Sequence, residues 1–318
     1  MRHFGRLSAC SWGVAGVLLA TCPAAAVEPR PATFPAADGL RLAADYYPPP
    51  VANRGPAPMA ILLHGAGADR HAWEPWIAPL HEVGFAVLAL DLRGHGDSAT
   101  TETRQAVADG RTDVFRHMQD DLRGAYDWLA QQPGLDRARF ALVGAGLGCS
   151  VAFQYAAKDR SVDALVGVSP VLNEHGLDAA GDISQITGRK VLLLAPEDQR
   201  DAPYTLQQRG RGVEVRLLTE AGTASRPVSV PAGHVAEAAR FLRTAVGDPT
   251  ATVVYGSINS HIYHQPESAW VERILPTNLR YYSSAQEAES RGLRAARAGP
   301  SSRDPTPEDE RPRRRRSR

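Results

Sequence analysis

One stretch, Phe140–Ser150, constrains the fold of this 318-residue chain more than any other. It begins with an unbroken apolar run, which is typical of a strand buried on both faces of a sheet. The run continues into Gly144-Ala145-Gly146-Leu147-Gly148, where three glycines alternate with apolar residues. Glycine permits both a sharp turn and a close approach between backbones. The stretch therefore predicts a buried strand, a tight turn and the start of a helix in direct succession.

Strands and helices alternate along the predicted domain. Apolar runs typical of buried strands occur at residues 59–63, 85–90, 164–168 and 191–195, after a hairpin signal at 31–47, and a last strand is expected at 213–218. Helical spacing of apolar residues occurs at 70–82, 113–131, 147–158, 203–209 and 233–246. This order predicts an α/β fold with a mostly parallel sheet covered by helices on both faces. The residues that follow the parallel strands should meet at one edge of the sheet: His64, Asp91, Gly146, Ser169 and Glu197.

Three motifs at that edge resemble those of the α/β-hydrolase superfamily. They are Leu62–Ala68 (LLHGAGA), Asp91–Ser98 (DLRGHGDS) and Leu142–Gly148 (LVGAGLG), each after a predicted strand. The resemblance covers about residues 33–247 and implies the α/β-hydrolase fold. It also implies a Ser–His–acid hydrolase of esters or related acyl bonds. The chain is most similar to esterase- or lipase-like bacterial members with little cap, because only a short segment follows Ser169-Pro170.

The resemblance places Gly146 at the nucleophile position, and glycine has no side-chain oxygen. The acid position falls on Gln199, with Asp198 one residue earlier. The base should follow the last strand, but residues 217–225 contain no histidine, and the next one is His234. We therefore predict a pseudo-hydrolase with a binding or scaffold role and no assigned catalytic residue. The alternative is an ester or acyl hydrolase that uses Asp198 and His234 as displaced catalytic groups.

The resemblance also assigns an oxyanion hole to the backbone N–H groups of Ala66 and Leu147. We expect His64, Gly65 and Ser169 to lie at the same pocket, which would take a small acyl-type ligand. Cys149 and Ser150 follow the turn within the helix, where neither side chain points as the turn residue does, and Cys149 is expected in the core. No cofactor and no metal are predicted.

The first 26 residues have the pattern of a signal peptide. A positive start is followed by an apolar run at residues 12–20, too short for a stable membrane span, and by Ala24-Ala25-Ala26, a small-residue cleavage site. We expect an exported, periplasmic or secreted protein. Two alternatives are lipidation and membrane anchoring at Cys22, which ends a sequence similar to a bacterial lipoprotein box, and an uncleaved N-terminal anchor.

Residues 249–299 resemble the small metal-binding module of DNA-repair regulatory methyltransferases. The chain keeps Tyr263-His264-Gln265-Pro266 and Asn278 of that pattern. The cysteine positions are occupied by Ser268, Ala296 and Gly299. Because thiolates hold zinc in such modules, we expect a small α+β fold without a metal.

Charge gives little guidance about partners. The net charge of +1 offers no case for specific nucleic-acid binding, although six arginines lie in residues 311–318. The segment 300–318 is predicted to be a disordered tail, either suited to anionic surfaces or merely solvated. The expected organisation is a signal peptide at 1–26, an α/β-hydrolase-like domain at 27–248, the small module at 249–299 and this tail.

Overall fold

The computed structural model describes the chain over residues 27–50, 55–218, 230–247, 254–257, 259–265, 268, 270–274, 278–282 and 285–296. The predicted signal peptide and the arginine-rich tail lie outside these residues. Within them, no helix is long and apolar enough to cross a membrane.

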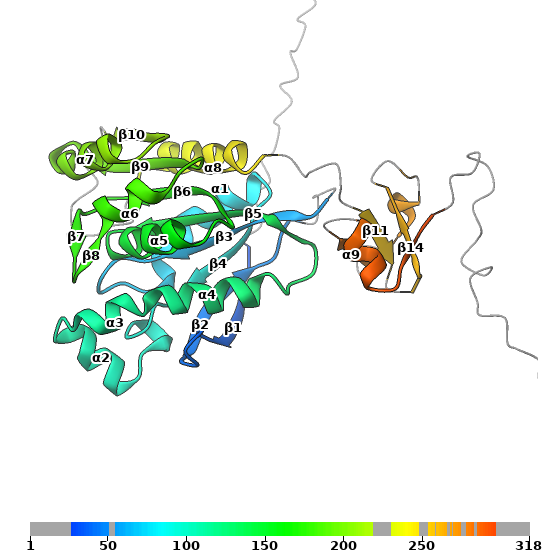
Figure 1. Cartoon of the computed structure of the whole chain (residues 1–318), viewed down its shortest axis with the longest axis horizontal. Helices are drawn as coiled ribbons and strands as arrows, with labels where there is room; N and C mark the ends of the chain where they lie inside the picture. The colour runs from blue at the N-terminus through cyan, green and yellow to red at the C-terminus, as the bar shows by residue number, and fades with distance from the viewer. Residues whose placement is uncertain are drawn as a thin grey trace, which may run out of the picture.

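An eight-stranded sheet forms the centre of the larger part of the chain (Figure 1). Its strands lie in the order β1 (Arg30–Pro35), β2 (Arg41–Tyr47), β4 (Ala86–Leu90), β3 (Ala57–Leu63), β5 (Leu135–Ala145), β6 (Val162–Val168), β9 (Lys190–Pro196) and β10 (Val213–Leu218). The β1–β2 and β2–β4 pairs are antiparallel, and the strands from β4 to β10 are parallel to one another. The structure thus confirms the predicted mostly parallel sheet.

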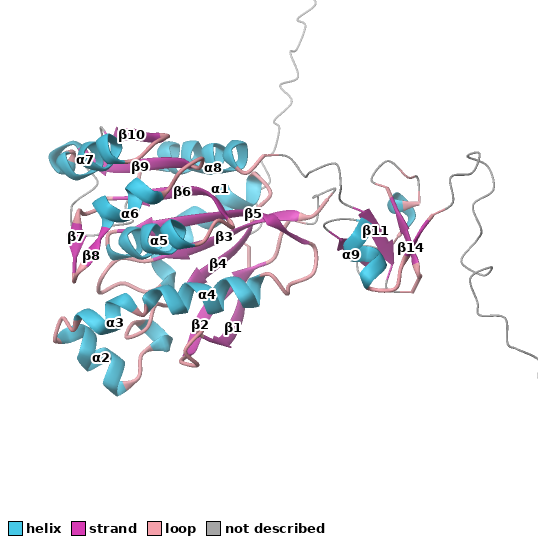
Figure 2. Cartoon of the chain, in the orientation of Figure 1, coloured by secondary structure: helices cyan, strands magenta, loops and turns pink. Residues whose placement is uncertain are grey.

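Helices cover both faces of this sheet, as Figure 2 shows by colour. One face carries α1 (Glu74–Glu82) and α8 (Ala232–Ala245). The core of the other face includes residues of α2 (Thr101–Ala108), α3 (Thr112–Arg116), α4 (Met118–Leu129), α5 (Leu147–Lys158), α6 (Ala179–Gln185) and α7 (Asp201–Arg209). A short hairpin, β7 (Asn173–Glu174) with β8 (Leu177–Asp178), precedes α6.

Strand β3 explains how one apolar run supplies two cores. Its side chains alternate between the faces, so Met59, Ile61 and Leu63 join the core under α4 and α5. Ala60 and Leu62 join the core under α1 and α8. All are fully buried, as a central parallel strand requires.

Two helical segments differ from the sequence-based expectation. The helix expected at 113–131 is divided at His117, which ends α3 and begins α4. Helix α2 was not predicted, and its signal is a capping box in which the side chains of Thr100 and Thr103 bond each other's backbone N–H. Threonine at the second position of that box, in place of the usual Glu or Gln, makes the signal weak.

The C-terminal region forms a separate four-stranded sheet, in the order β13 (Leu279–Tyr282), β11 (Val254–Ser257), β12 (Ile262–His264) and β14 (Arg294–Ala295). Helix α9 (Ala285–Ser290) packs on it, and a single 3-10 turn, η4 (Val271–Arg273), precedes β13. Its small core contains Val254, Tyr263 and Ala288. The predicted small α+β fold is confirmed.

Candidate functional site

The turn between β5 and α5 has an unusual backbone. Gly146 has φ 50° and ψ −114°, in the left-handed half of the map that favours glycine. Its N–H donates to the carbonyl of Val168 (3.0 Å), and its carbonyl accepts from the N–H of Cys149 (2.9 Å). Gly146 therefore projects from the sheet edge at a sharp strand-to-helix turn, and hydrogen bonds of both its N–H and its carbonyl fix this turn.

The two flanking glycines are required by close backbone contacts. A Cβ on Gly148 would lie 2.0 Å from the carbonyl oxygen of Leu63 in β3. A Cβ on Gly144 would lie 2.4 Å from the carbonyl oxygen of Gly148. The start of α5 thus lies directly against β3 and β5, which fixes the turn in place.

The space beside Gly146 is open. A Cβ there would meet only the Cα of Gly65, at 3.9 Å. The loop after β3, which contains the predicted oxyanion donor Ala66, therefore faces the turn. Leu147 lies in the first turn of α5, where backbone N–H groups have no acceptor within the helix. The structure brings together the elements that carry the two predicted oxyanion donors.

His64 is fully buried beneath this loop. Its Nε2 accepts from the N–H of Leu92 (3.1 Å), so Nδ1 carries the proton and donates to the carbonyl of Gly65 (2.8 Å). Burial lowers the pKa of His64 to about 4, against a smaller opposing effect of the Gly65 hydrogen bond. Both ring nitrogens are engaged, so this histidine shapes the loop and has no lone pair for a substrate proton.

His95 packs next to it, with ring centroids 5.0 Å apart. Its Nδ1 lies 3.1 Å from the carbonyl of Arg93, and its Nε2 is buried without a partner in the described part of the chain. Burial lowers the pKa of His95, and the Arg93 carbonyl only partly offsets this.

Sequence reasoning missed the role of Arg70, which ties the β3 loop to the loop after β4. Its backbone N–H donates to Asp91 Oδ1 (2.7 Å), and its guanidinium contacts Asp91 Oδ2 as well. The same guanidinium pairs with Asp45 (3.2 Å) and Asp97 (2.8 Å). Asp91 is fully buried, so this network holds the loop after β3 against the loop after β4. In the sequence, the only signal for this network is that an arginine follows His64 by six residues.

Cys149 and Ser150 lie inside the fold and away from the open space. The Cys149 thiol contacts the carbonyls of Gly144 (3.1 Å) and Val168 (3.3 Å). Complete burial raises the pKa of this thiol far above its ordinary value. Ser150 is fully buried in the first turn of α5, so neither residue presents a nucleophile at the turn.

The two displaced catalytic candidates are not joined. Asp198 is exposed in η3 (Glu197–Gln199), a 3-10 turn just beyond β9. His234 is half-buried in the first turn of α8. No hydrogen bond among the described residues connects them. The loop 219–229, where the base is expected, lies outside the described residues.

The segment after β6 borders the same edge of the sheet. Ser169 has φ 46°, and its N–H donates to the carbonyl of Leu194 (2.7 Å). In the hairpin that follows, burial raises the pKa of Glu174, whose Oε2 has no partner among the described residues. The ring of His175 stacks on Phe115 with centroids 3.9 Å apart, which ties this hairpin to α3.

In the C-terminal module, the positions of two expected cysteines carry no thiol. Ser268 Oγ accepts from the N–H of Trp270 (3.3 Å), and the N–H of Ala296 donates to the carbonyl of Tyr263 (2.8 Å). His264 stacks against Trp270 with ring centroids 6.2 Å apart. Over the described residues, no three His, Cys, Asp or Glu side chains are grouped to hold a metal ion. The third position, Gly299, lies outside them.

The comparison with known sequences identifies the family. The model of the alpha/beta hydrolase fold family matches residues 60–184, from β3 to α6. An uncharacterized protein of Mycobacterium tuberculosis is 31% identical over 215 residues, which are 62% of this chain and 69% of that protein. The chain belongs to the α/β-hydrolase superfamily. A thiohydrolase of Aspergillus aculeatus is 29% identical over 140 residues, or 44% of this chain and 41% of that protein.

Solved α/β-hydrolase structures share the fold. The α/β hydrolase GrgF from Penicillium superposes with a TM-score of 0.56 at 18% identity, covering 69% of this chain and 99% of that one. An esterase of Pyrococcus furiosus superposes with a TM-score of 0.55 at 19% identity, covering 70% and 92%. The shared part therefore lies in the large sheet domain.

A nucleophile turn of the α/β-hydrolase superfamily has two functions. Its backbone positions hydrogen-bond donors, and its central side chain attacks the substrate. The backbone still turns sharply, faces the β3 loop and presents the first-turn amides of α5. The reacting oxygen that covalent acyl transfer requires is absent at Gly146.

Proposed function

We propose that this chain is an exported α/β-hydrolase-fold protein that binds a small acyl-type ligand, or serves as a scaffold, without Ser–His–acid hydrolysis. One observation carries the proposal: the turn residue Gly146 has a positive-φ turn conformation, with open space beside it, yet no side chain. The fold supplies a site for a carbonyl oxygen, and the sequence supplies no atom to attack it.

Three further observations support the absence of the conventional reaction. His64 has both nitrogens engaged, so it cannot act as the general base. Cys149 is a buried thiol with a raised pKa, and it cannot replace the serine. His234 and Asp198 lack the mutual hydrogen bond by which an acid orients a catalytic histidine. Loss of both nucleophile and base leaves only the weak effects of binding and the oxyanion hole.

The remaining parts of the chain fit a binding role. The C-terminal module carries His264 without the thiolates that hold zinc, so we propose that it is retained as a small fold without a metal. The signal-like residues 1–26 support export, with anchoring through Cys22 as the alternative. The arginine-rich tail is suited to anionic surfaces of the exported environment.

The proposal is tested by activity-based labelling of the pure full chain. A fluorophosphonate probe should leave it unlabelled, and a panel of p-nitrophenyl esters of increasing acyl length should show no turnover above background. Labelling, or turnover that disappears in His234→Ala, would overturn the proposal in favour of the displaced-group hydrolase. An active esterase of the same fold, assayed in parallel, controls for probe quality.

Binding is tested separately by adding short-chain fatty acids and following the thermal unfolding midpoint. A ligand raises that midpoint only if it binds the folded state. Gly146→Leu should abolish the increase, because its side chain occupies the open space. Gly188→Leu is the matched control, since Gly188 also has a positive φ and an unobstructed Cβ position. Equal loss in both variants, or no increase for the original chain, would contradict the binding role.

A further inference from the structure

Positive charge gathers at the end of the large sheet opposite to Gly146. Three neighbouring parallel strands, β6, β9 and β10, begin at that end, whereas Gly146 follows the end of β5. The residues that lie at or just before these three starts include five basic ones: Arg160, Arg189, Lys190, Arg209 and Arg211. We call these five residues the basic edge.

Strand pairing places the three segments of the basic edge side by side. Lys190 is opposite Ala164 in the β6–β9 pair, and Val191 is opposite Val213 in the β9–β10 pair. The N–H of Val191 also donates to the carbonyl of Gly212 (3.2 Å), just before β10. Because adjacent strands lie about 4.8 Å apart, the positive charges form a row across the three segments.

Most of these charges have no partner. The side chains of Arg160, Lys190, Arg209 and Arg211 are exposed and make no hydrogen bond or ion pair with any described residue. The guanidinium of Arg189 contacts the carbonyl of Ala156. Burial and the nearby charge of Arg160 lower the pKa of Arg189, so two like charges lie close together.

The neighbouring carboxylates are engaged within the domain. Asp159 pairs with Arg123 (3.3 Å) and accepts from the hydroxyl of Tyr155 (2.9 Å). Asp163 accepts from the N–H of Phe140 (2.8 Å), and burial raises the pKa of this carboxyl. These two acidic groups are therefore directed into the domain, and the row keeps its positive charge.

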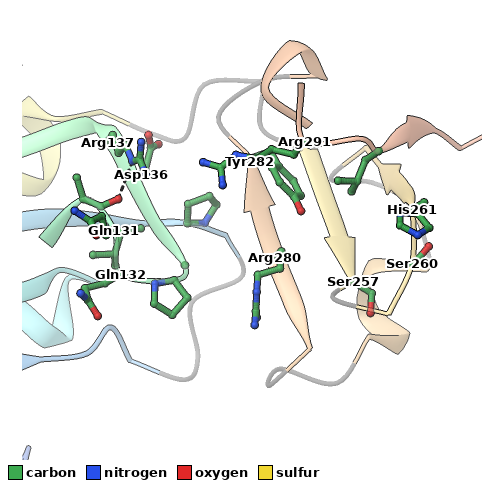
Figure 3. A pocket seen from close by; sticks show the side chains of 16 residues that line it. Gln131, Gln132, Asp136, Arg137, Ser257, Ser260, His261, Arg280, Tyr282 and Arg291 are labelled. Atoms are coloured by element: carbon green, nitrogen blue, oxygen red, sulfur yellow. Dashed lines mark hydrogen bonds between the residues drawn. The ribbon is translucent and has the colours of Figure 1, made fainter. Parts of the chain in front are cut away.

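The C-terminal module leaves the basic edge uncovered. It faces residues 130–137 of the main domain, and the two parts enclose a cavity of about 500 Å³ (Figure 3). None of the five basic residues lines that cavity. The row is thus a separate surface that the module does not share.

The chain enters the domain at the same end of the sheet. Strand β1 is antiparallel to β2, and β2 is antiparallel to β4, so β1 begins at the end where the parallel strands begin. Its first residue, Arg30, is exposed there. A chain anchored through Cys22 would therefore present this end of the domain to the membrane.

We propose that the basic edge binds the anionic lipid headgroups of a membrane surface. A row of unpaired cations suits a surface with many separate negative charges, whereas a small anion needs groups that converge on one point. Four of the five residues are arginines, and guanidinium groups match the geometry of lipid phosphates. A membrane bound at this end leaves the turn at Gly146, at the other end of the sheet, accessible.

Cosedimentation of the full chain with vesicles tests the proposal. Vesicles of phosphatidylcholine and phosphatidylglycerol in equal parts should bind the chain, and pure phosphatidylcholine vesicles should not. Binding should weaken as salt is added, because screening reduces the attraction between exposed charges. Equal binding to both kinds of vesicle, or to neither, would overturn the proposal.

Variants locate the contact on the domain. The double variant Arg209→Gln/Arg211→Gln should lower the affinity for anionic vesicles by about tenfold or more, since each cation near such a surface contributes about fivefold. The control is Arg104→Gln/Arg116→Gln, which removes two exposed arginines of α2 and α3. The arginine-rich tail is identical in all of these chains, so an equal effect of the two double variants would assign binding to the tail and overturn the basic edge.

A second pair tests the length of the row. Arg160→Gln/Lys190→Gln should weaken vesicle binding to a similar degree, and dependence on one pair alone would contradict a surface that spans three segments. All four side chains are exposed, so thermal unfolding should stay near the original temperature.

Polyglutamate distinguishes an acidic protein partner from a lipid surface. If it binds with the same dependence on the variants while anionic vesicles do not bind, the lipid proposal is wrong. None of these substitutions lies near Gly146, so ligand binding at the turn and lipid binding at the basic edge fail independently.

Discussion

The Cα of Gly65 lies 3.9 Å from the point that a Cβ on Gly146 would occupy. The two glycines belong to loops that follow neighbouring strands, β3 and β5. Their approach places the β3 loop opposite the strand-to-helix turn, which is the arrangement needed to surround a carbonyl oxygen with backbone donors. The two loops thus face each other beside Gly146, a position that carries no side chain.

Gly146→Ser should fit the site without restoring hydrolysis. The side chain has room, but a non-glycine residue with positive φ costs about 1–2 kcal/mol of folding free energy. Turnover of p-nitrophenyl esters should stay at background because, under the proposed function, the chain lacks a base to activate the hydroxyl. Gly146→Ala separates the two effects, since it carries the same backbone strain and no hydroxyl. Strong hydrolysis by the serine variant alone would reveal a base that the described residues do not explain.

Gly148→Ala should disrupt the domain. Its Cβ would lie 2.0 Å from a backbone carbonyl of β3, and backbone cannot move aside as a flexible side chain can. We expect a loss of about 3 kcal/mol or more in the free energy of unfolding, measured by urea titration. Gly233→Ala is the control, because that helical position has no neighbour within 4 Å and should gain up to about 1 kcal/mol. Equal stability of the two variants would contradict the close contact.

Acidification should destabilise the fold through His64. Its pKa is about 4 in the folded chain and 6.5 for an unperturbed histidine, so in this range the unfolded chain binds a proton that the folded chain does not. This contribution to stability is present above pH 6.5 and is lost as the pH falls toward 4. Its size is about 3 kcal/mol.

Urea unfolding across that pH range measures the effect. His64→Asn is the comparison, because its amide can donate to Gly65 and accept from Leu92 but does not titrate. The original chain should lose more stability on acidification than this variant. Parallel pH dependences would show that His64 is not the responsible group. Imidazole NMR signals should also show a neutral ring throughout most of the range.

Cys149 should be inert in the native chain. Burial raises the pKa of its thiol, and iodoacetamide reacts with the exposed thiolate. Peptide mass mapping should find Cys149 unmodified under native conditions and alkylated in denaturing guanidinium chloride. Alkylation of the native chain at a rate similar to that of the unfolded chain would contradict its placement in the core.

Local sequence patterns determined most of the fold. The apolar runs predicted the parallel strands because a strand covered on both faces must be apolar throughout. The glycines at 144, 146 and 148 predicted the turn, and Gly146 led to the prediction that the conventional nucleophile is missing. The boundary at His117 was not predicted, because the apolar spacing continues across it and only the backbone conformation divides the two helices.

Only the tertiary structure decided what the remaining polar residues do. The sequence places His64 at the sheet edge, but its two hydrogen bonds depend on Leu92 and Gly65, which lie in different loops. The contacts of Arg70 depend likewise on carboxylates from two separate segments, β2 and the loop after β4. Chain order carries no information about such contacts, because the sheet brings residues from distant strands to one edge. The sequence alone determined that glycine occupies the turn position, and the packing of strands determined the surroundings of Gly146.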